Sequence, residues 1–409
     1  MITLNPPPQL ILSDLNDSLN GKEINIETMI NRREFIKKTS MGAAAISVAG
    51  LTQSGINNSE SGIKPVGGRV IDAHMHVTPG KVKKALQVMD DNFIRYGVII
   101  ASIAGSDPDQ YVGDKAFYEI SEAIKPYKNR LALHYTYDWT LAETDPDFFN
   151  KAPDMLEKAV KAGAIALKNL KQLGLVARDH EGKLIAIDDP RLFPIWERAE
   201  KLGIPVAFHT GDPVAFFNPW NPKNERWEEL ELHPEWSFSD RSKYPPLETL
   251  FAQANNVYKK FRKIQFVSVH VGGYSENLKE VSRWLDEIPN LSVDTAARIG
   301  ELGKHPASEG YDFFNKYQDR IMFGTDMAYW EGCDVQGAGP CKDFTLDEDR
   351  NFYNIHWRYL QTKDKQFDHP TPIQGKWKID GIGLQTAALK KIYWDNAYRF
   401  YKLNRVGVA

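Results

Sequence analysis

The chain has 409 residues, of which 42% are hydrophobic and 26% are charged, and its formal net charge is −3. These values are typical of a globular protein, and the near balance of charge, without a basic stripe interleaved with aromatics, argues against a nucleic-acid partner. No apolar run reaches the roughly 18 residues that a membrane span needs.

The first 65 residues are predicted to lie outside the fold. Residues 29–54 carry Arg32 and Arg33 before a short, weakly apolar segment, which is typical of a twin-arginine export signal. The alternative is an Ala-rich helix that follows an arginine pair by chance. Because Met29 stands where such a signal would begin, residues 1–28 are interpreted as an upstream extension and residues 55–65 as a polar linker. We expect a periplasmic protein without a stable membrane anchor, since no cysteine follows the apolar segment.

Short apolar or β-branched runs alternate with helical segments between residues 66 and 405. The predicted strands are Val70–Ala73, Gly97–Ile103, Leu131–Tyr137, Ala164–Leu170, Pro205–His209, Ile264–His270, Leu291–Asp294 and Ile321–Asp326. The predicted helices are Val82–Ile94, Lys115–Ile124, Asp154–Ala162, Arg191–Leu202, Leu247–Phe261, Ser275–Ile288, Ser308–Tyr317 and Gln385–Tyr401. This alternation predicts an α/β fold, a (β/α)8 TIM barrel. An open doubly wound sheet is the alternative, but no Gly-rich phosphate-binding motif follows the first strand.

Two segments are too long to be simple loops, Gly211–Pro246 after strand 5 and Met327–Gly383 after strand 8. Both are rich in aromatic residues, so we expect long insertions at the C-terminal mouth of the barrel, where the active sites of TIM barrels lie. The second insertion holds Cys333 and Cys341, which either close one loop as a disulfide or remain free thiols.

Polar residues gather at the ends of the predicted strands. His74 and His76 end the first strand, and because residues two apart in a strand share a face, they are expected to project together, on the same face as Asp72. Three further polar residues, His209, His270 and Asp326, each follow another apolar run. A single histidine at a strand end is usually structural, but this set of imidazoles and a carboxylate suits zinc.

The motifs DAHMH, DDPRLFPIWERAEKLGIPVAFHTGDP, VHVGG, NLSVDTAAR and FGTDMAYW resemble the amidohydrolase superfamily. More narrowly, the chain is similar to the amidohydrolase-related group that includes aminocarboxymuconate-semialdehyde decarboxylase, other non-oxidative decarboxylases and metal-dependent hydrolases. The resemblance spans residues 68–401. It implies that His74, His76, His209 and Asp326 bind one divalent metal, with zinc expected and manganese as the alternative. It also implies that His270 and Asp326 are catalytic and act with a metal-activated water.

Lys168, near the end of the fourth predicted strand, has three alternative roles. It binds an anionic or hydroxyl-rich substrate, it bridges two metals as a carboxylated lysine does in some amidohydrolases, or it pairs with a neighbouring carboxylate. Trp220 and Trp330, in the two insertions, are expected to contact the substrate. For the tryptophans of the first insertion, the alternative is that they only pack it.

Arg298 follows the seventh predicted strand, where a guanidinium could hold a substrate carboxylate in two parallel hydrogen bonds. The alternative is an ion pair with Asp294 or Glu301 that fixes the loop. Asp72 is expected either to orient a ligand imidazole or to act as a buried capping carboxylate.

The predicted function is a metal-dependent hydrolase that acts on a small lactone, amide or ester-type substrate. The alternative is a non-oxidative decarboxylase, a carbon–carbon lyase of an unsaturated or aromatic carboxylic acid, in which the same site would protonate carbon. A non-catalytic binding protein is disfavoured because all five metal-binding and proton-transfer positions are filled. The expected partner is a small-molecule substrate, and a homo-oligomer remains open.

Overall fold

The computed structural model describes residues 62–102, 112–337 and 339–406, which belong to one compact unit. The predicted extension (1–28), the predicted export signal (29–54) and most of the predicted linker lie outside the described residues. Within the described part of the chain, no helix combines the length and the apolar character that crossing a bilayer requires.

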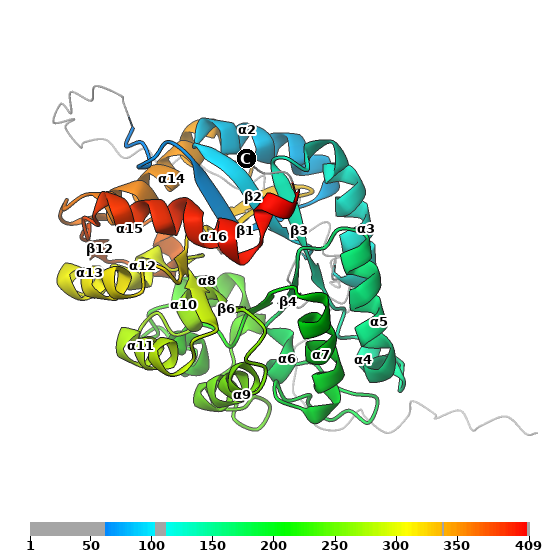
Figure 1. Cartoon of the computed structure of the whole chain (residues 1–409). Coiled ribbons are helices and arrows are strands. Elements are labelled where there is room, and N and C mark those ends of the chain that lie inside the picture. Colours follow the sequence, from blue (N-terminus) through cyan, green and yellow to red (C-terminus); the bar gives the residue numbers. More distant parts are fainter. Residues whose placement is uncertain (1–61, 103–111, 338, 407–409) are drawn as a thin grey trace, which may run out of the picture. The chain divides into compact units, whose positions relative to one another are not determined.

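The fold is built on one sheet of ten strands. Its parallel strands are β1 (Val70–Val77), β2 (Ile94–Ile100), β3 (Leu131–Thr136), β4 (Ala166–Asn169), β5 (Val206–Phe208), β6 (Phe266–Ser268), β7 (Leu291–Asp294) and β8 (Ile321–Met322). Each of these strands pairs in parallel with the next along the chain. Helices lie between consecutive strands and surround the sheet (Figure 1). The predicted α/β barrel is therefore confirmed.

The sheet curls until the end of β8 meets β1. The backbone N–H of Ala73 donates to the carbonyl of Phe323 at 3.0 Å, and the N–H of Asp326 donates to the carbonyl of His74 at 2.9 Å. Directly after Asp326, β9 (Met327–Trp330) continues in parallel beside β1, and β10 (Cys333–Gln336) returns antiparallel to β9. The residues that follow β8 are thus held against the strand that carries His74 and His76.

Helices surround the sheet, and the longer ones each bury one apolar face. These helices are α2 (Val82–Asp91), α3 (Gly113–Ile124), α4 (Leu141–Thr144), α5 (Phe148–Lys161), α6 (Gln172–Leu175), α7 (Phe193–Leu202), α9 (Leu247–Lys260), α11 (Leu278–Glu287), α12 (Ile299–Leu302) and α13 (Ala307–Lys316). In α11, for example, the buried residues Leu278, Val281 and Leu285 recur at helical spacing, and the side chain of Asn277 caps the first turn by accepting from the N–H of Glu280.

The C-terminal segment closes the end of the barrel opposite the C-terminal ends of the strands. The predicted last helix is observed as α15 (Thr386–Lys390), a π-helical segment η7 (Lys391–Asp395) and α16 (Asn396–Phe400). Several of its aromatic residues pack in one buried cluster with residues from seven strands of the sheet, among them Ala132, Ala166 and Ala207. These small residues leave room inside the barrel, which Trp394, Phe400 and Tyr401 fill.

The described residues of the two predicted insertions contain short helices and strands. The first contains the short helices η4 (Val214–Phe217), α8 (Trp227–Leu232) and η5 (Pro234–Trp236). The second contains the β9–β10 hairpin, α14 (Leu346–Gln361), η6 (Pro372–Gln374) and the two-stranded sheet of β11 (Phe367–Asp368) and β12 (Lys378–Ile379). The helix α14 was not predicted, although Thr345 and Glu348 form the capping box that begins it.

Candidate metal centre and cavity

A shift in the register of β1 decides which of its side chains enter the site. The pairing with β2 is irregular between Asp72 and Met75, so the strict alternation of faces is broken there. His74 and His76 both line the cavity at the C-terminal ends of the strands, as predicted from their spacing. Asp72 does not join them.

Asp72 instead holds together the two chain segments that meet at the site. One oxygen accepts the backbone N–H groups of His74 (3.2 Å) and Thr325 (3.1 Å), and the other accepts the hydroxyls of Thr325 (2.6 Å) and Tyr353 (3.2 Å). Burial raises the pKa of Asp72 to about 7 in spite of these bonds. The expectation that Asp72 orients a ligand imidazole is therefore wrong, and its role as a buried carboxylate that fixes the backbone is the correct one.

The rings of His74 and His76 are fixed through their Nδ1 atoms. Nδ1 of His74 lies 2.8 Å from Oδ2 of Asp294, and Nδ1 of His76 lies 2.7 Å from the carbonyl oxygen of Ser102. Since both partners can only accept, both Nδ1 atoms carry a proton, and each neutral ring has its lone pair on Nε2. Both Nε2 atoms lie 3.3 Å from the same carboxylate oxygen, Oδ1 of Asp326.

This arrangement fits a divalent metal. The ligand atoms of His74, His76 and Asp326 lie within 4.8 Å of one another, and all three bear lone pairs that face each other. A cation bound between the three groups would remove the electrostatic repulsion between their lone pairs. Protonation of the rings is the other way to remove it, but burial lowers the pKa of His74. The carboxylate of Asp326 supplies an oxygen ligand beside the two ring nitrogens.

Asp294, which ends β7, couples this centre to His270. While Oδ2 accepts from the ring of His74, Oδ1 accepts from the backbone N–H of His270 at 2.7 Å. From the sequence, Asp294 was expected only as a possible ion-pair partner of Arg298. Its position at the end of a predicted strand, like that of the other site residues, was the signal that could have identified it.

His270 lies in a strained turn beside the centre. The segment His270–Gly273 has φ values of 58°, 55°, 76° and 72°, a left-handed turn that is unfavourable for His270 and for the β-branched Val271. The turn places the His270 ring with its centre 4.8 Å from that of His74 and 4.3 Å from that of His209. Nδ1 of His270 donates to the carbonyl of Ala296 at 2.9 Å, and burial holds the pKa of the ring well below its usual value. His270 therefore presents an unprotonated Nε2.

His209 lies in the same cavity but is engaged by another residue. Its Nε2 lies 3.4 Å from Oδ1 of Asp212, whose Oδ2 accepts from Nζ of Lys171 at 2.7 Å. Burial opposes ionisation of Asp212, but Lys171 and His209 lower its pKa to about 2. Asp212 and Lys171 were not singled out in the sequence, although Asp212 stands three residues after His209. The structure thus places His209 beside the centre without grouping it with the other three predicted ligands.

The centre opens into a cavity of about 320 Å³, a size that suits a small molecule. Lys168, Arg298 and Trp330 line it, as do the predicted metal ligands and His270. Trp220 does not: its side chain is 40% exposed, and its ring packs against that of Trp227.

Trp236 lines the cavity in place of Trp220. Its ring stacks on that of His233 with centres 3.9 Å apart, and Nζ of Lys171 lies 4.5 Å from its centre. Trp236 is therefore held in place by protein groups and forms a fixed wall of the cavity.

Lys168 and Arg298 are buried cations without a carboxylate partner among the described residues. Nζ of Lys168 has no hydrogen-bond partner there, and burial lowers its pKa to about 8. Arg298 donates from Nη1 to the carbonyl of Ala297 at 3.0 Å. The ion pairs considered for Arg298 are absent in this part of the chain, because Asp294 binds His74 and Glu301 pairs with the buried Arg226.

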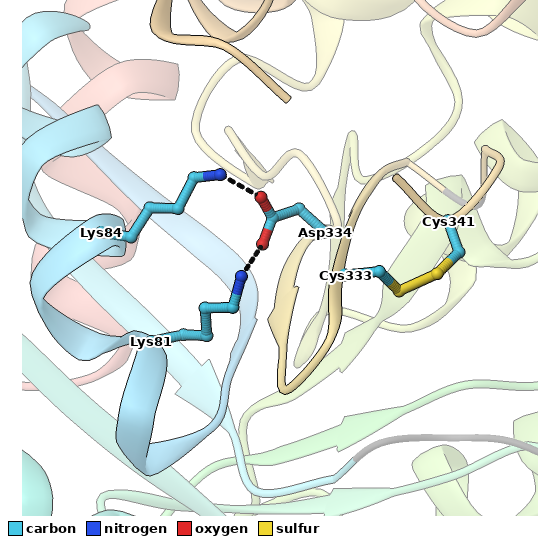
Figure 2. Close-up of a disulfide and its surroundings, with 5 residues drawn as sticks. All are labelled: Lys81, Lys84, Cys333, Asp334 and Cys341. Atoms are coloured by element: carbon cyan, nitrogen blue, oxygen red, sulfur yellow. Dashed lines mark hydrogen bonds and ion pairs between the residues drawn. A yellow bond between two sulfur atoms is a disulfide. The ribbon is translucent and has the colours of Figure 1, made fainter. Parts of the chain in front are cut away.

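A disulfide joins Cys333 to Cys341 at one side of the cavity, which Cys341 and Val335 line. Figure 2 shows Asp334 pointing from β10 toward Lys81 and Lys84, and Cys333 pointing the other way toward Cys341. Asp334 is fully buried, so this double ion pair anchors the hairpin to the start of α2. Of the two alternatives for these cysteines, the structure contains the disulfide and not the free thiols.

Comparisons with known proteins show the family and agree with the barrel fold. The family model described as Amidohydrolase matches residues 71–403. No curated protein matches the chain. An uncharacterized TIM-barrel protein from Bordetella bronchiseptica is similar in structure, with 15% identity, a TM-score of 0.50, and coverage of 82% of this chain and 99% of that one. A 2,6-dihydroxybenzoate decarboxylase from Rhizobium (15% identity, TM-score 0.47) and a probable 2-pyrone-4,6-dicarboxylic acid hydrolase from Acinetobacter baumannii (13%, 0.43) match over the same shares of both chains. At 15% identity, the similarity to the Bordetella bronchiseptica protein shows the fold alone.

Proposed function

Because this chain belongs to the amidohydrolase family, we propose that it is a metal-dependent hydrolase that cleaves a small lactone, amide or ester-type substrate with water. The observation that carries the proposal is the convergence of two Nε2 lone pairs and the Asp326 carboxylate at the floor of a cavity. A binding protein without catalysis would need neither this open centre nor the strained His270 beside it.

His74, His76 and Asp326 would hold the metal, with His209 as the proposed fourth ligand. Zinc is the proposed ion, because two or three imidazoles and one carboxylate suit it, and manganese is the alternative. When bound, such an ion supplies a Lewis acid that polarises a substrate carbonyl and lowers the pKa of water. His209 would have to release Asp212 to join the other ligands, and Lys171 would then remain the partner of Asp212.

His270 is the proposed proton-transfer residue. Its Nδ1 is committed to the carbonyl of Ala296, so only Nε2 can exchange a proton with a molecule in the cavity. Burial keeps the ring neutral before reaction, so Nε2 is free to take a proton from the attacking water and then to deliver it to the leaving group. Asp294 holds the backbone of His270 and the ring of His74 in one arrangement.

Non-oxidative decarboxylation of an unsaturated or aromatic acid is the second candidate. Lys168 and Arg298 favour it, because two buried cations without carboxylate partners can hold the carboxylate that is to be lost. In this reaction Nε2 of His270 would first take up a proton from water and would then deliver it to the carbon that loses CO2.

A substrate screen separates the two reactions. Metal-loaded and metal-stripped protein would be incubated with lactones, sugar acids and aromatic acids, and release of acid and of CO2 would be recorded for each. We expect metal-dependent release of acid, which His270→Asn reduces by roughly a hundredfold or more. Release of CO2 without any hydrolysis would overturn the hydrolase proposal in favour of the lyase.

We further propose that the protein is exported to the periplasm by the twin-arginine route. The Cys333–Cys341 disulfide supports this, since disulfides persist in oxidising compartments. The test is fractionation of cells that produce the full chain and its double variant Arg32→Lys, Arg33→Lys. We expect only the unaltered chain in the periplasmic fraction, and equal export of both would contradict the proposal.

A further inference from the structure

Asp212 is a buried carboxylate that depends on two side chains. Its Oδ2 accepts from Nζ of Lys171 at 2.7 Å, and its Oδ1 lies 3.4 Å from Nε2 of His209. Among the described residues, these are its two hydrogen-bonding partners. A buried charge without a partner is costly, so the two contacts are linked: when one is given up, the other has to satisfy the carboxylate alone.

Lys171 reaches Asp212 from the side of the first insertion. It stands between β4 and α6, and its ammonium nitrogen lies 4.5 Å from the ring centre of Trp236 and 5.9 Å from that of Phe238. Trp236 is itself stacked on His233. Two aromatic rings and a short ion pair therefore hold this cation, and its position does not depend on the histidine that shares Asp212.

His209 is the one predicted metal ligand that does not reach the centre. Neither of its ring nitrogens groups with the ligand atoms of the other three predicted ligands, which lie within 4.8 Å of one another. The contact of His209 with Asp212, at 3.4 Å, is close to the limit of a hydrogen bond, whereas that of Lys171 is short. The contact with His209 is therefore the weaker one, and it is the one that can be given up when the ring moves toward the centre.

We propose that Lys171 is a positioning residue for the metal centre: it satisfies the charge of Asp212, so that His209 can leave this carboxylate and become the fourth ligand. Without Lys171, the departure of His209 would leave Asp212 buried and unpaired, and the carboxylate would retain the histidine. Asp212 then competes with the metal for His209, and Lys171 sets the balance of this competition. The inference rests on the proposed role of His209 as a metal ligand.

The zinc affinity of the full chain, measured by competition with a chromogenic chelator, tests this role in three variants. We expect Lys171→Met to bind zinc roughly tenfold more weakly, because Asp212 then holds His209 more firmly. We expect Asp212→Asn, which no longer holds His209 through a charge, to bind zinc at least as tightly as the unaltered chain. The double variant should match Asp212→Asn alone, since Lys171 acts only through Asp212.

These signs separate the inference from simpler explanations. The plain effect of charge has the opposite signs, because loss of a cation favours a bound metal ion and loss of an anion disfavours it. A merely structural role would lower the zinc affinity in all three variants. Unchanged or tighter binding in Lys171→Met, or weaker binding in Asp212→Asn, would overturn the inference. Asp212→Asn decides the question even if Lys171→Met does not fold.

Three controls complete the test. Lys171→Arg keeps the charge and should retain the zinc affinity. Lys316→Met is the matched control, because Lys316 also pairs with an aspartate, Asp286 at 2.8 Å, and lies 4.9 Å from the ring centre of Tyr317, on the surface. An equal loss of affinity in Lys316→Met and Lys171→Met would contradict the role of Lys171. If His209→Ala leaves the zinc affinity unchanged, both the ligand assignment and the inference fail. If His209→Ala weakens zinc binding and Lys171→Met does not, only the inference fails.

Discussion

Oδ2 of Asp294 lies 2.8 Å from Nδ1 of His74, and this contact sets which nitrogen of the histidine can bind a metal. The carboxylate of Asp294 accepts from both the ring Nδ1–H of His74 and the backbone N–H of His270. The amide of Asp294→Asn has one oxygen acceptor and would have to turn its NH2 group toward one of these two donors. We expect the variant to favour the wrong tautomer of His74 and to bind zinc 10- to 100-fold more weakly, the usual cost of losing such a partner. Competition with a chromogenic chelator measures this affinity, with the exposed Asp286→Asn as the control. An unchanged zinc affinity would refute the role of Asp294.

Asp72 gives a pH dependence of stability with a defined sign. Its pKa is raised from 3.8 to about 7 in the folded protein, so between these pH values the folded state binds more protons than the unfolded state. Stability is therefore lost as pH rises through this range, by up to roughly 4 kcal/mol from this group alone.

The isosteric variant Asp72→Asn cannot titrate, and its amide can still bond the hydroxyls of Thr325 and Tyr353. We expect the free energy of unfolding of the metal-free variant to decline less between about pH 4 and about pH 7 than that of the unaltered chain. Urea unfolding at a series of pH values measures both curves, and parallel curves would show that Asp72 does not titrate as described.

The lowered pKa of Lys168 predicts how the affinity for carboxylic acids changes in alkaline solution. Burial lowers its pKa to about 8, so its ammonium group loses the proton as pH rises through that value. We expect the dissociation constant of benzoate, a simple carboxylate probe, to rise severalfold between about pH 7 and about pH 9. Lys168→Met should bind benzoate weakly at both values, and Lys168→Arg should remove the pH dependence. A pH dependence that persists in Lys168→Met would assign it to another group.

The Cys333–Cys341 disulfide closes a short loop beside the cavity. A loop of this length is expected to stabilise the folded state by about 2–3 kcal/mol, mainly by restricting the unfolded chain. Cys341→Ser should lower the free energy of unfolding by that amount. It should also weaken the binding of benzoate, because Cys341 lines the cavity. Denaturant unfolding and calorimetry test the two effects, and an unaltered stability would mean that the disulfide does not form in solution.

The sequence predicted the barrel because strand and helix periodicity survives in each βαβ unit, and it predicted the histidine pair because both follow one apolar run. It misplaced Asp72, because a register shift within β1 breaks the alternation on which that expectation depended. Strand-end position could have singled out Asp294, and closeness to His209 could have singled out Asp212, but their contacts with His74 and Lys171 join residues that are distant in the chain and that no local pattern predicts. Trp236 and not Trp220 reaches the cavity because of how the first insertion folds, and aromatic composition does not determine this.

The central claim is that His74, His76 and Asp326 form a centre for one divalent ion, and metal stoichiometry tests it most directly. The purified chain would be stripped of metal with a chelator, loaded with excess zinc and desalted. Its zinc content would then be measured by inductively coupled plasma mass spectrometry. We predict one zinc per chain, lost in His76→Ala and Asp326→Asn and retained in His180→Ala, whose histidine is exposed. A chain that retains no zinc, or variants that retain as much as the unaltered protein, would contradict the claim. Two zinc ions per chain would replace it with a binuclear site to which Lys168 contributes.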